Sequence, residues 1–117
     1  MVHGFSIERM KIITNKFLPP KGFSYINLFG VLFTRRKTTE ISEKTLRHET
    51  IHTKQMKELW YLPFYIIYVA EWLNKLIYYR NAHEAYRNIG FEREAYVNEE
   101  DPDYLGNRKR FAWVEYV

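Results

Sequence analysis

The feature that most constrains this chain is the stretch RHETIHTKQ, residues 47–55, which contains the pattern H-E-x-x-H at His48, Glu49 and His52. On an α-helix, two histidines four residues apart project from the same face, so both imidazoles can bind one metal ion. Glu49 then lies one position round the helix, beside the ion rather than on it. The pattern carries this chemistry only if the stretch is helical.

Independent signals predict a helix here. Ser42 is a good N-cap, and Glu43 places an acid in the first turn, where the helix dipole favours negative charge. Ile41 and Leu46 have the spacing of a hydrophobic staple. We therefore expect a helix over residues 43–59, with both histidines in its middle.

The residues before this helix predict a small sheet. Residues 19–22, Pro-Pro-Lys-Gly, mark a turn. Gly30 fits either a turn between two strands or a bulge inside one longer strand. We expect an antiparallel sheet in a strand-rich segment, residues 1–40. The strand-like runs are residues 11–15, 25–29 and 31–34.

The residues after it predict further helices. Pro63 suits the first turn of a helix with a continuous apolar stripe, which we expect to be buried. A third helical stretch, residues 82–100, is weakened or broken at Gly90, and an Asp-Pro pair after it favours a short last helix. The chain is thus expected to be one α+β domain, residues 1–117. Its small N-terminal sheet precedes three or four helices, and the helical segment, residues 41–117, carries the metal site.

A catalytic zinc site commonly uses three protein ligands and a water, whose pKa zinc lowers to about 7. The chain has no cysteine, so the ligands must be nitrogen and oxygen atoms. Glu49 would take a proton from the water and pass it to the leaving amine. No further histidine follows His52 at a suitable spacing, so the third ligand is expected to be a carboxylate on a later helix. The candidates are Glu84, Glu92, Glu94, Glu99 and Glu100.

A family resemblance narrows this choice. His48, Glu49 and His52, followed downstream by FEREA at residues 91–95, resemble the motifs of the gluzincin metallopeptidases, including their minimal single-domain members. The resemblance covers roughly residues 25–100, although its specific content is two short motifs. Members of this family take their third zinc ligand from a glutamate on a helix after the motif helix, often within Glu-x-x-Ala.

The resemblance implies a minimal zincin-like fold and hydrolysis of peptide bonds in a peptide or protein substrate. It implies one Zn²⁺ per chain, held by His48, His52 and Glu92, with Glu49 as the general base. A strand of the preceding sheet would align an extended substrate, and residues 31–34 are the candidate. Gln55 is expected to lie on the helix surface or to support a ligand.

Some family features have no single counterpart. Tyr96 stands where gluzincins often carry Asp or another short polar residue. Latent members block the cleft with a terminal segment, and residues 111–117 are apolar enough for that or for packing on the core. An inactive metal-binding pseudo-peptidase that acts as a binding or regulatory module is therefore an alternative. The side chain that stabilises the oxyanion is left open among Tyr79, His83, Tyr86 and Tyr96.

Composition limits the partners. The net charge of +4 comes with short basic clusters, at residues 35–37 and 108–110, that are typical of solvated loops, so no nucleic acid is expected. The apolar run at residues 59–70 is shorter than the roughly 20 residues of a membrane span. The aromatic residues 60–79 leave a second alternative, a membrane-peripheral interaction protein. Without cysteine or a signal-like apolar segment in residues 1–10, a cytoplasmic location is expected.

Overall fold

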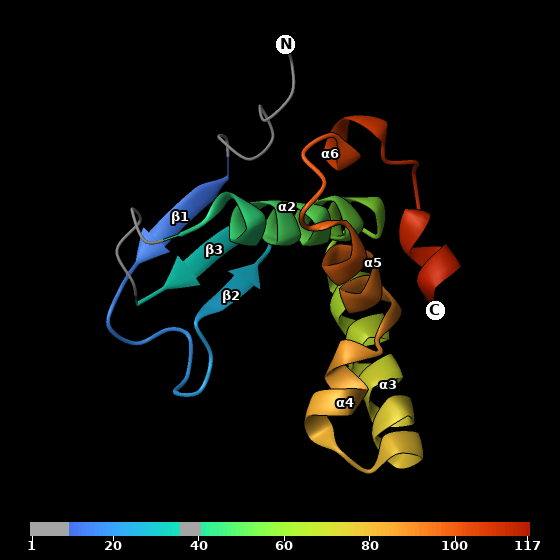
Figure 1. The fold of residues 1–117 in the computed structure, drawn as a ribbon. Helices are drawn as coiled ribbons and strands as arrows, with labels where there is room; N and C mark the ends of the chain where they lie inside the picture. The colour runs from blue at the N-terminus through green and yellow to red at the C-terminus, as the bar shows by residue number, and fades with distance from the viewer. Residues whose placement is uncertain (1–9, 36–40) are drawn as a thin grey trace.

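The computed structural model of this chain describes residues 10–35 and 41–117. The predicted α+β class is confirmed: a small sheet is followed by helices (Figure 1). The strands are β1 Lys11–Thr14, β2 Tyr25–Leu28 and β3 Val31–Thr34, in the order β1-β3-β2. The helices are α2 Glu43–Glu58, α3 Leu62–Tyr79, α4 Ala82–Arg87, α5 Gly90–Asn98 and α6 Tyr104–Asn107, and a 3₁₀ helix, η2, spans Ala112–Tyr116.

The sheet is mixed, so the expectation of an antiparallel sheet is wrong for one of its two strand pairs. β2 pairs antiparallel with β3, but β1 pairs parallel with β3. The chain reverses once between β1 and β2 and again at the β2–β3 turn, so β3 runs in the same direction as β1. Gly30 belongs to that turn, where Phe29 and Gly30 have φ values of 54° and 89°.

The β2–β3 hairpin is anchored to α2. The buried Asn27 amide of β2 donates to the Glu49 carbonyl oxygen at 3.0 Å and to Thr53 Oγ1 at 3.1 Å. At the turn, a Cβ on Gly30 would lie 3.3 Å from Thr53 Cγ2, so the hairpin lies close against the helix. The sheet is thereby held beside the middle of α2.

Local signals place the start of α2 where the sequence predicts it, whereas the last helix, α6, begins at Tyr104 and not at the Asp101-Pro102 pair. Ser42 caps α2, and its Oγ accepts a hydrogen bond from the Thr45 amide at 3.1 Å. The predicted stretch over residues 82–100 is divided just before Gly90 into α4 and α5. The described residues therefore form five α-helices, one more than the largest number expected.

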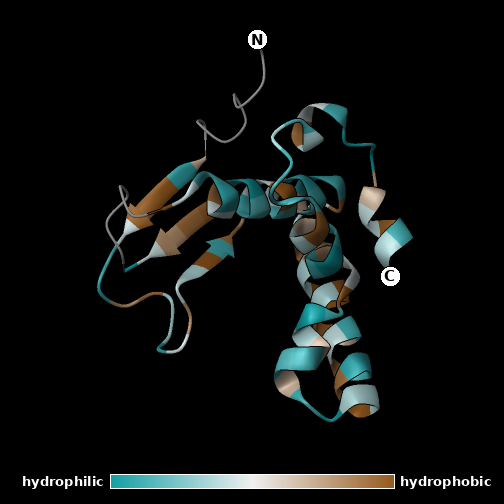
Figure 2. Ribbon diagram, in the orientation of Figure 1, coloured by the Kyte–Doolittle hydropathy of each residue, from teal (hydrophilic) through white to brown (hydrophobic). Residues whose placement is uncertain are grey.

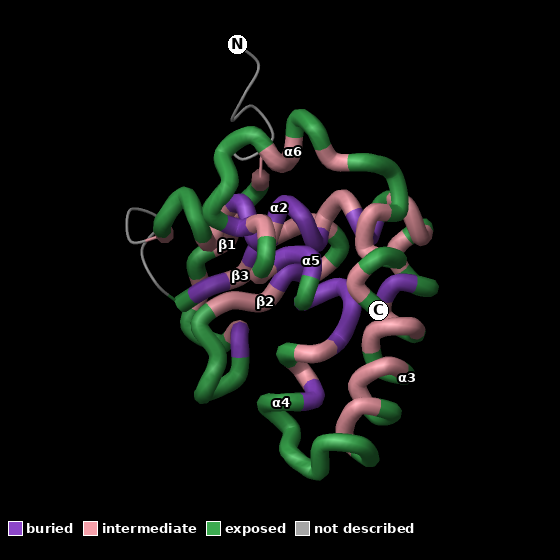
Figure 3. The backbone as a smooth tube through the Cα atoms, turned by 45° about the vertical axis from the view of Figure 1, so that its right-hand side comes forward, coloured by how far each residue is buried: buried purple, intermediate pink, exposed green. Residues whose placement is uncertain are grey.

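The core joins α2, α3 and α5 through Met56, Phe64, Ile89 and Phe91, and buried backbone concentrates there and in β3 (Figure 3). The expectation that the apolar stripe of α3 is buried is wrong. Phe64 is the only buried residue of α3, because the helix packs through an aromatic side that includes Tyr68 and Trp72. None of the helices in the described ranges combines the length and apolarity needed to cross a membrane.

The C-terminal segment packs on α5. Trp113 lies 4.6 Å from the Phe91 ring, and Arg93 donates to the Tyr116 carbonyl oxygen at 2.6 Å. A Cβ on Gly90 would lie 2.8 Å from Val117 Cγ2. Gly90 lies on the side of α5 turned away from Glu92, since successive residues advance by about 100°. Packing on the core is thus what the structure shows for this segment.

Candidate metal centre

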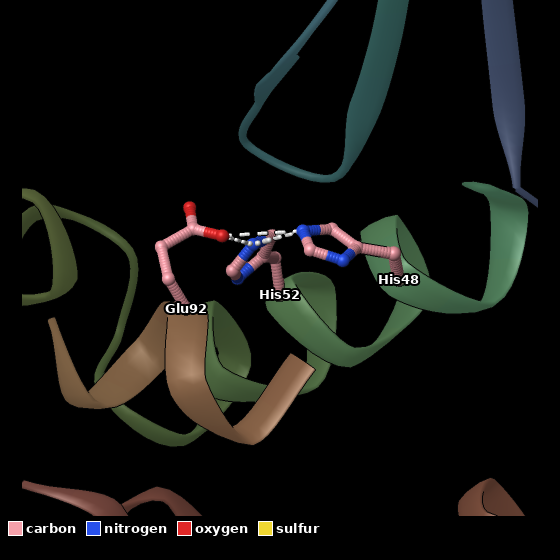
Figure 4. A group of neighbouring side chains, drawn as sticks. All are labelled: His48, His52 and Glu92. Carbon is pink, nitrogen blue, oxygen red and sulfur yellow. Dashed lines mark hydrogen bonds and ion pairs between the residues drawn. The ribbon is translucent and has the colours of Figure 1, made fainter. Parts of the chain in front are cut away.

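Three side chains from two helices converge at one point (Figure 4). His48 and His52 come from α2 and Glu92 from α5, and each is 4–7% exposed. Glu92 Oε1 lies 3.2 Å from His48 Nε2 and 3.1 Å from His52 Nε2, and the two nitrogens are 3.2 Å apart. Among the described residues, these three form the group of His, Asp and Glu side chains that could hold a metal ion.

α5 packs against α2, and small or apolar buried residues lie next to the candidate ligands in both helices. Ala95 is fully buried one turn beyond Glu92, and Ile51 is fully buried between the two histidines. A side chain that ends at Cβ lets α5 pack close to α2, which brings the Glu92 carboxylate within reach of both imidazoles. The Glu-x-x-Ala spacing of the sequence therefore has a packing reason in this fold.

The tautomer of His52 follows from its partners. His52 Nδ1 lies 2.8 Å from Gln55 Oε1. Gln55 Nε2 donates to the Phe91 carbonyl oxygen at 3.0 Å and to Glu94 Oε1 at 2.9 Å, which are both acceptors. The amide oxygen of Gln55 must therefore accept a hydrogen bond from His52 Nδ1–H, and His52 Nε2 presents its lone pair to the cluster.

The partners of His48 and Glu92 lead to the same result. His48 Nδ1 lies 2.8 Å from Glu99 Oε1, and Lys44 pairs with the other oxygen of Glu99 at 3.3 Å. An ionised carboxylate only accepts hydrogen bonds, so Nδ1 of His48 donates and its Nε2 presents a lone pair. Tyr68 donates to Glu92 Oε2 at 2.7 Å and leaves Oε1 facing the histidines.

Three lone-pair atoms thus face one another and require a positive charge between them. A tetrahedral zinc ion with bonds of about 2.0 Å places its ligands about 3.3 Å apart, close to the observed spacing. Burial lowers the pKa of His52, but the Glu92 carboxylate outweighs it and raises this pKa to about 9. Burial alone would raise the pKa of Glu92, yet His52 and His48 hold it well below its usual range. Without a metal, a proton on His52 supplies the charge at neutral pH.

Glu49 lies beside this cluster and is half-buried. Burial raises the pKa of its carboxyl, while His52 and His48 lower it and Glu92 raises it. The charges of all three cluster residues therefore act on Glu49, as expected of a carboxyl next to the metal position.

The other four glutamate candidates lie elsewhere. Glu94 is fully buried, but it pairs with Arg108, whose Nε lies 2.5 Å from Glu94 Oε2. Glu99 stands behind His48, on its Nδ1 side. Glu84 and Glu100 are exposed. The structure brings Glu92 alone of the five together with both histidines.

Several supporting residues were weakly signalled or missed by the sequence. Gln55 supports His52, one of the two roles expected for it. Tyr68, which donates to Glu92, belongs to no recognisable sequence motif. Its only sequence signal is its position on the core-facing side of α3. Tyr96 packs its ring 4.5 Å from the ring of His48, which accounts for an aromatic residue after Ala95.

The strand expected to align a substrate is not the one at the edge of the sheet. β3 pairs on both sides, with β1 and with β2, so its backbone cannot add another strand. Within the described residues, β2 is the outer strand that lies next to α2.

Comparison of the chain with protein-family models, with curated proteins and with solved structures found no match. The resemblance to gluzincins therefore rests on the two sequence motifs alone, and function has to be argued from the geometry of the site.

Proposed function

We propose that this protein binds one Zn²⁺ through His48, His52 and Glu92 and hydrolyses peptide bonds, as a gluzincin-type metallopeptidase acting on a peptide or protein substrate. The observation that carries the proposal is the convergence of three lone-pair atoms at the spacing of a tetrahedral ion. Two imidazoles and one carboxylate are also a donor set that zinc accepts in catalytic sites.

The chain's own residues supply the remaining chemistry. Bound zinc would act as a Lewis acid and lower the pKa of water to about 7. Glu49, whose pKa burial raises, accepts a proton from water and returns it to the leaving amine. Tyr68 is committed to Glu92. The favoured donor to the developing oxyanion is the hydroxyl pair of Tyr86 and Tyr96, which lie 2.7 Å apart, because the ring of Tyr96 packs against His48.

A second candidate function is metal binding without turnover. The observation that favours it is the burial of all three proposed ligand residues, which are at most 7% exposed. Such a chain would act as a binding or regulatory module that uses the metal to hold α5 on α2. Hydrolysis of peptides by the zinc-loaded protein distinguishes the two functions.

Metal content is the first test. Purified wild-type protein is expected to hold one equivalent of zinc by mass spectrometry, and His48→Ala and Glu92→Ala are each expected to lose it. The exposed glutamate change Glu100→Gln serves as the matched control and keeps the metal. Retention of zinc by Glu92→Ala would move the third ligand to another residue. Absence of metal from the wild type after incubation with zinc and removal of the excess would overturn the metal-site proposal.

The support of His48 by Glu99 predicts a smaller effect. Glu99→Gln keeps the size of the side chain but weakens the hydrogen bond that fixes His48, so zinc affinity is expected to fall about 10- to 100-fold. Competition against a chelator of known affinity measures the change, with Glu100→Gln again as the control. Equal affinity in both variants would show that Glu99 does not position the ligand.

A further inference from the structure

One face of α3 exposes a row of large apolar side chains. Its five large members are 49–77% exposed, and the exposed Ala70 lies between them. At about 100° per residue they occupy an arc of about 100° along the helix, and hydrophobic colour recurs along α3 in Figure 2. We call Leu62, Ile66, Val69, Ala70, Leu73 and Ile77 the α3 face.

The α3 face carries no charge. The two charged residues of α3 lie on other sides of the helix, and the Glu71 carboxylate accepts a hydrogen bond from the Gly90 amide at 2.7 Å. An exposed apolar patch of this length on a small domain indicates a contact with another apolar surface. In Figure 1, α3 and α4 extend together away from α2.

We propose that the α3 face pairs with the same face of a second copy of this chain, with the two helices antiparallel. The sequence of the face is symmetric about the midpoint between Val69 and Ala70, its two smallest residues. Leu62 and Ile77 are equally far from that midpoint, as are Ile66 and Leu73. A two-fold axis there places Leu62 against Ile77 of the partner subunit.

The arrangement also satisfies helix-packing rules. The face consists of two rows with a spacing of four residues, which are 62, 66, 70 and 69, 73, 77. Such rows form the ridges that fit into the grooves of another helix. The same two-fold axis places each row of one copy against the other row of its partner, so both rows are used without a mismatch.

The area and the charge favour a second copy over a lipid surface. Pairing would remove on the order of 1,000 Å² from water, which reaches the lower range of specific interfaces. Helices that lie on membranes carry Lys and Arg on their polar face. α3 has a single such residue, Lys75, and its half-buried side chain lies opposite the α3 face.

The oligomeric state tests the proposal. Sedimentation equilibrium of the wild-type protein is expected to give twice the chain mass of 14.3 kDa. Ile66→Lys is expected to weaken dimerisation at least about a hundredfold, because it buries an unpaired charge on each side of the axis. Val97→Lys, at an exposed apolar position of α5, is the matched control and stays dimeric. Circular dichroism and zinc content check that each variant is folded, so the result does not depend on the proposed peptidase activity.

The orientation has its own test, since the chain has no cysteine. Under mild oxidation, a mixture of Leu62→Cys and Ile77→Cys proteins is expected to form mixed disulfide dimers, and neither variant alone is expected to cross-link. Cross-linking of each variant with itself would indicate parallel helices and overturn the proposed pairing. A monomeric wild type, or a dimer unaffected by Ile66→Lys, would overturn it as well. A monomer that sediments with phospholipid vesicles would assign the α3 face to a membrane instead.

Discussion

Glu49→Gln is expected to leave zinc bound and to lower the rate of peptide hydrolysis by about 10²- to 10⁴-fold. Glutamine has the size of glutamate, but its amide cannot accept a proton from water or return one to the leaving amine. The proposed ligand atoms belong to His48, His52 and Glu92, so the change is not expected to remove a bond to the metal. The measurement is kcat/KM on a fluorogenic peptide library, with zinc content determined on the same samples.

The control for this change is Glu84→Gln, which neutralises an exposed glutamate of α4 and is expected to leave both quantities unchanged. Unchanged hydrolysis by Glu49→Gln would show that another group serves as the base. Loss of zinc together with hydrolysis would assign Glu49 to metal binding rather than to proton transfer. Zinc-loaded wild-type protein that cuts no peptide would leave metal binding without turnover as the function.

The parts of the fold predicted from sequence are those set by neighbouring residues. α2 begins at Glu43, as predicted, because Ser42 is its N-cap. The Ser42 side chain accepts a hydrogen bond from the amide of the residue three positions later. The break before Gly90 also has a local cause, since glycine lowers helix propensity. In contrast, the parallel pairing of β1 with β3 joins residues about 20 positions apart and has no local signal.

The candidate site also has a part that follows from local sequence and a part that depends on long-range contacts. His48 and His52 share a face because of the helix period alone, which is readable from their spacing. The choice of Glu92 over Glu94 depended on a family motif, because side chains of the same type two positions apart differ only in what they face. The ion pair with Arg108 holds Glu94 away from the histidines. The two residues are 14 positions apart and share no motif, so the sequence does not reveal this contact.

Arg108→Met is expected to lower the free energy of unfolding by about 3–5 kcal/mol, because it leaves carboxylates buried without a cation. The Arg108 side chain is 4% exposed and bridges two glutamates from different helices. Its guanidinium lies 2.7 Å from Glu58 Oε2 and 2.5 Å from Glu94 Oε2, and Tyr104 donates to the latter oxygen at 2.6 Å. For a domain of this size, the loss corresponds to a fall in Tm of more than about 10 °C.

The loss of stability in Arg108→Met is expected to come from the buried carboxylates left without a partner. Removal of an exposed cation is expected to have little effect. Arg110→Met removes an exposed arginine two positions away and is expected to change Tm by no more than about 2 °C. Adding Glu94→Gln to Arg108→Met removes one of the stranded carboxylates, so the double variant is expected to be more stable than Arg108→Met alone. Thermal unfolding followed by circular dichroism measures all three. Equal Tm values for the two arginine variants would show that the α2–α5 contact does not depend on this ion cluster.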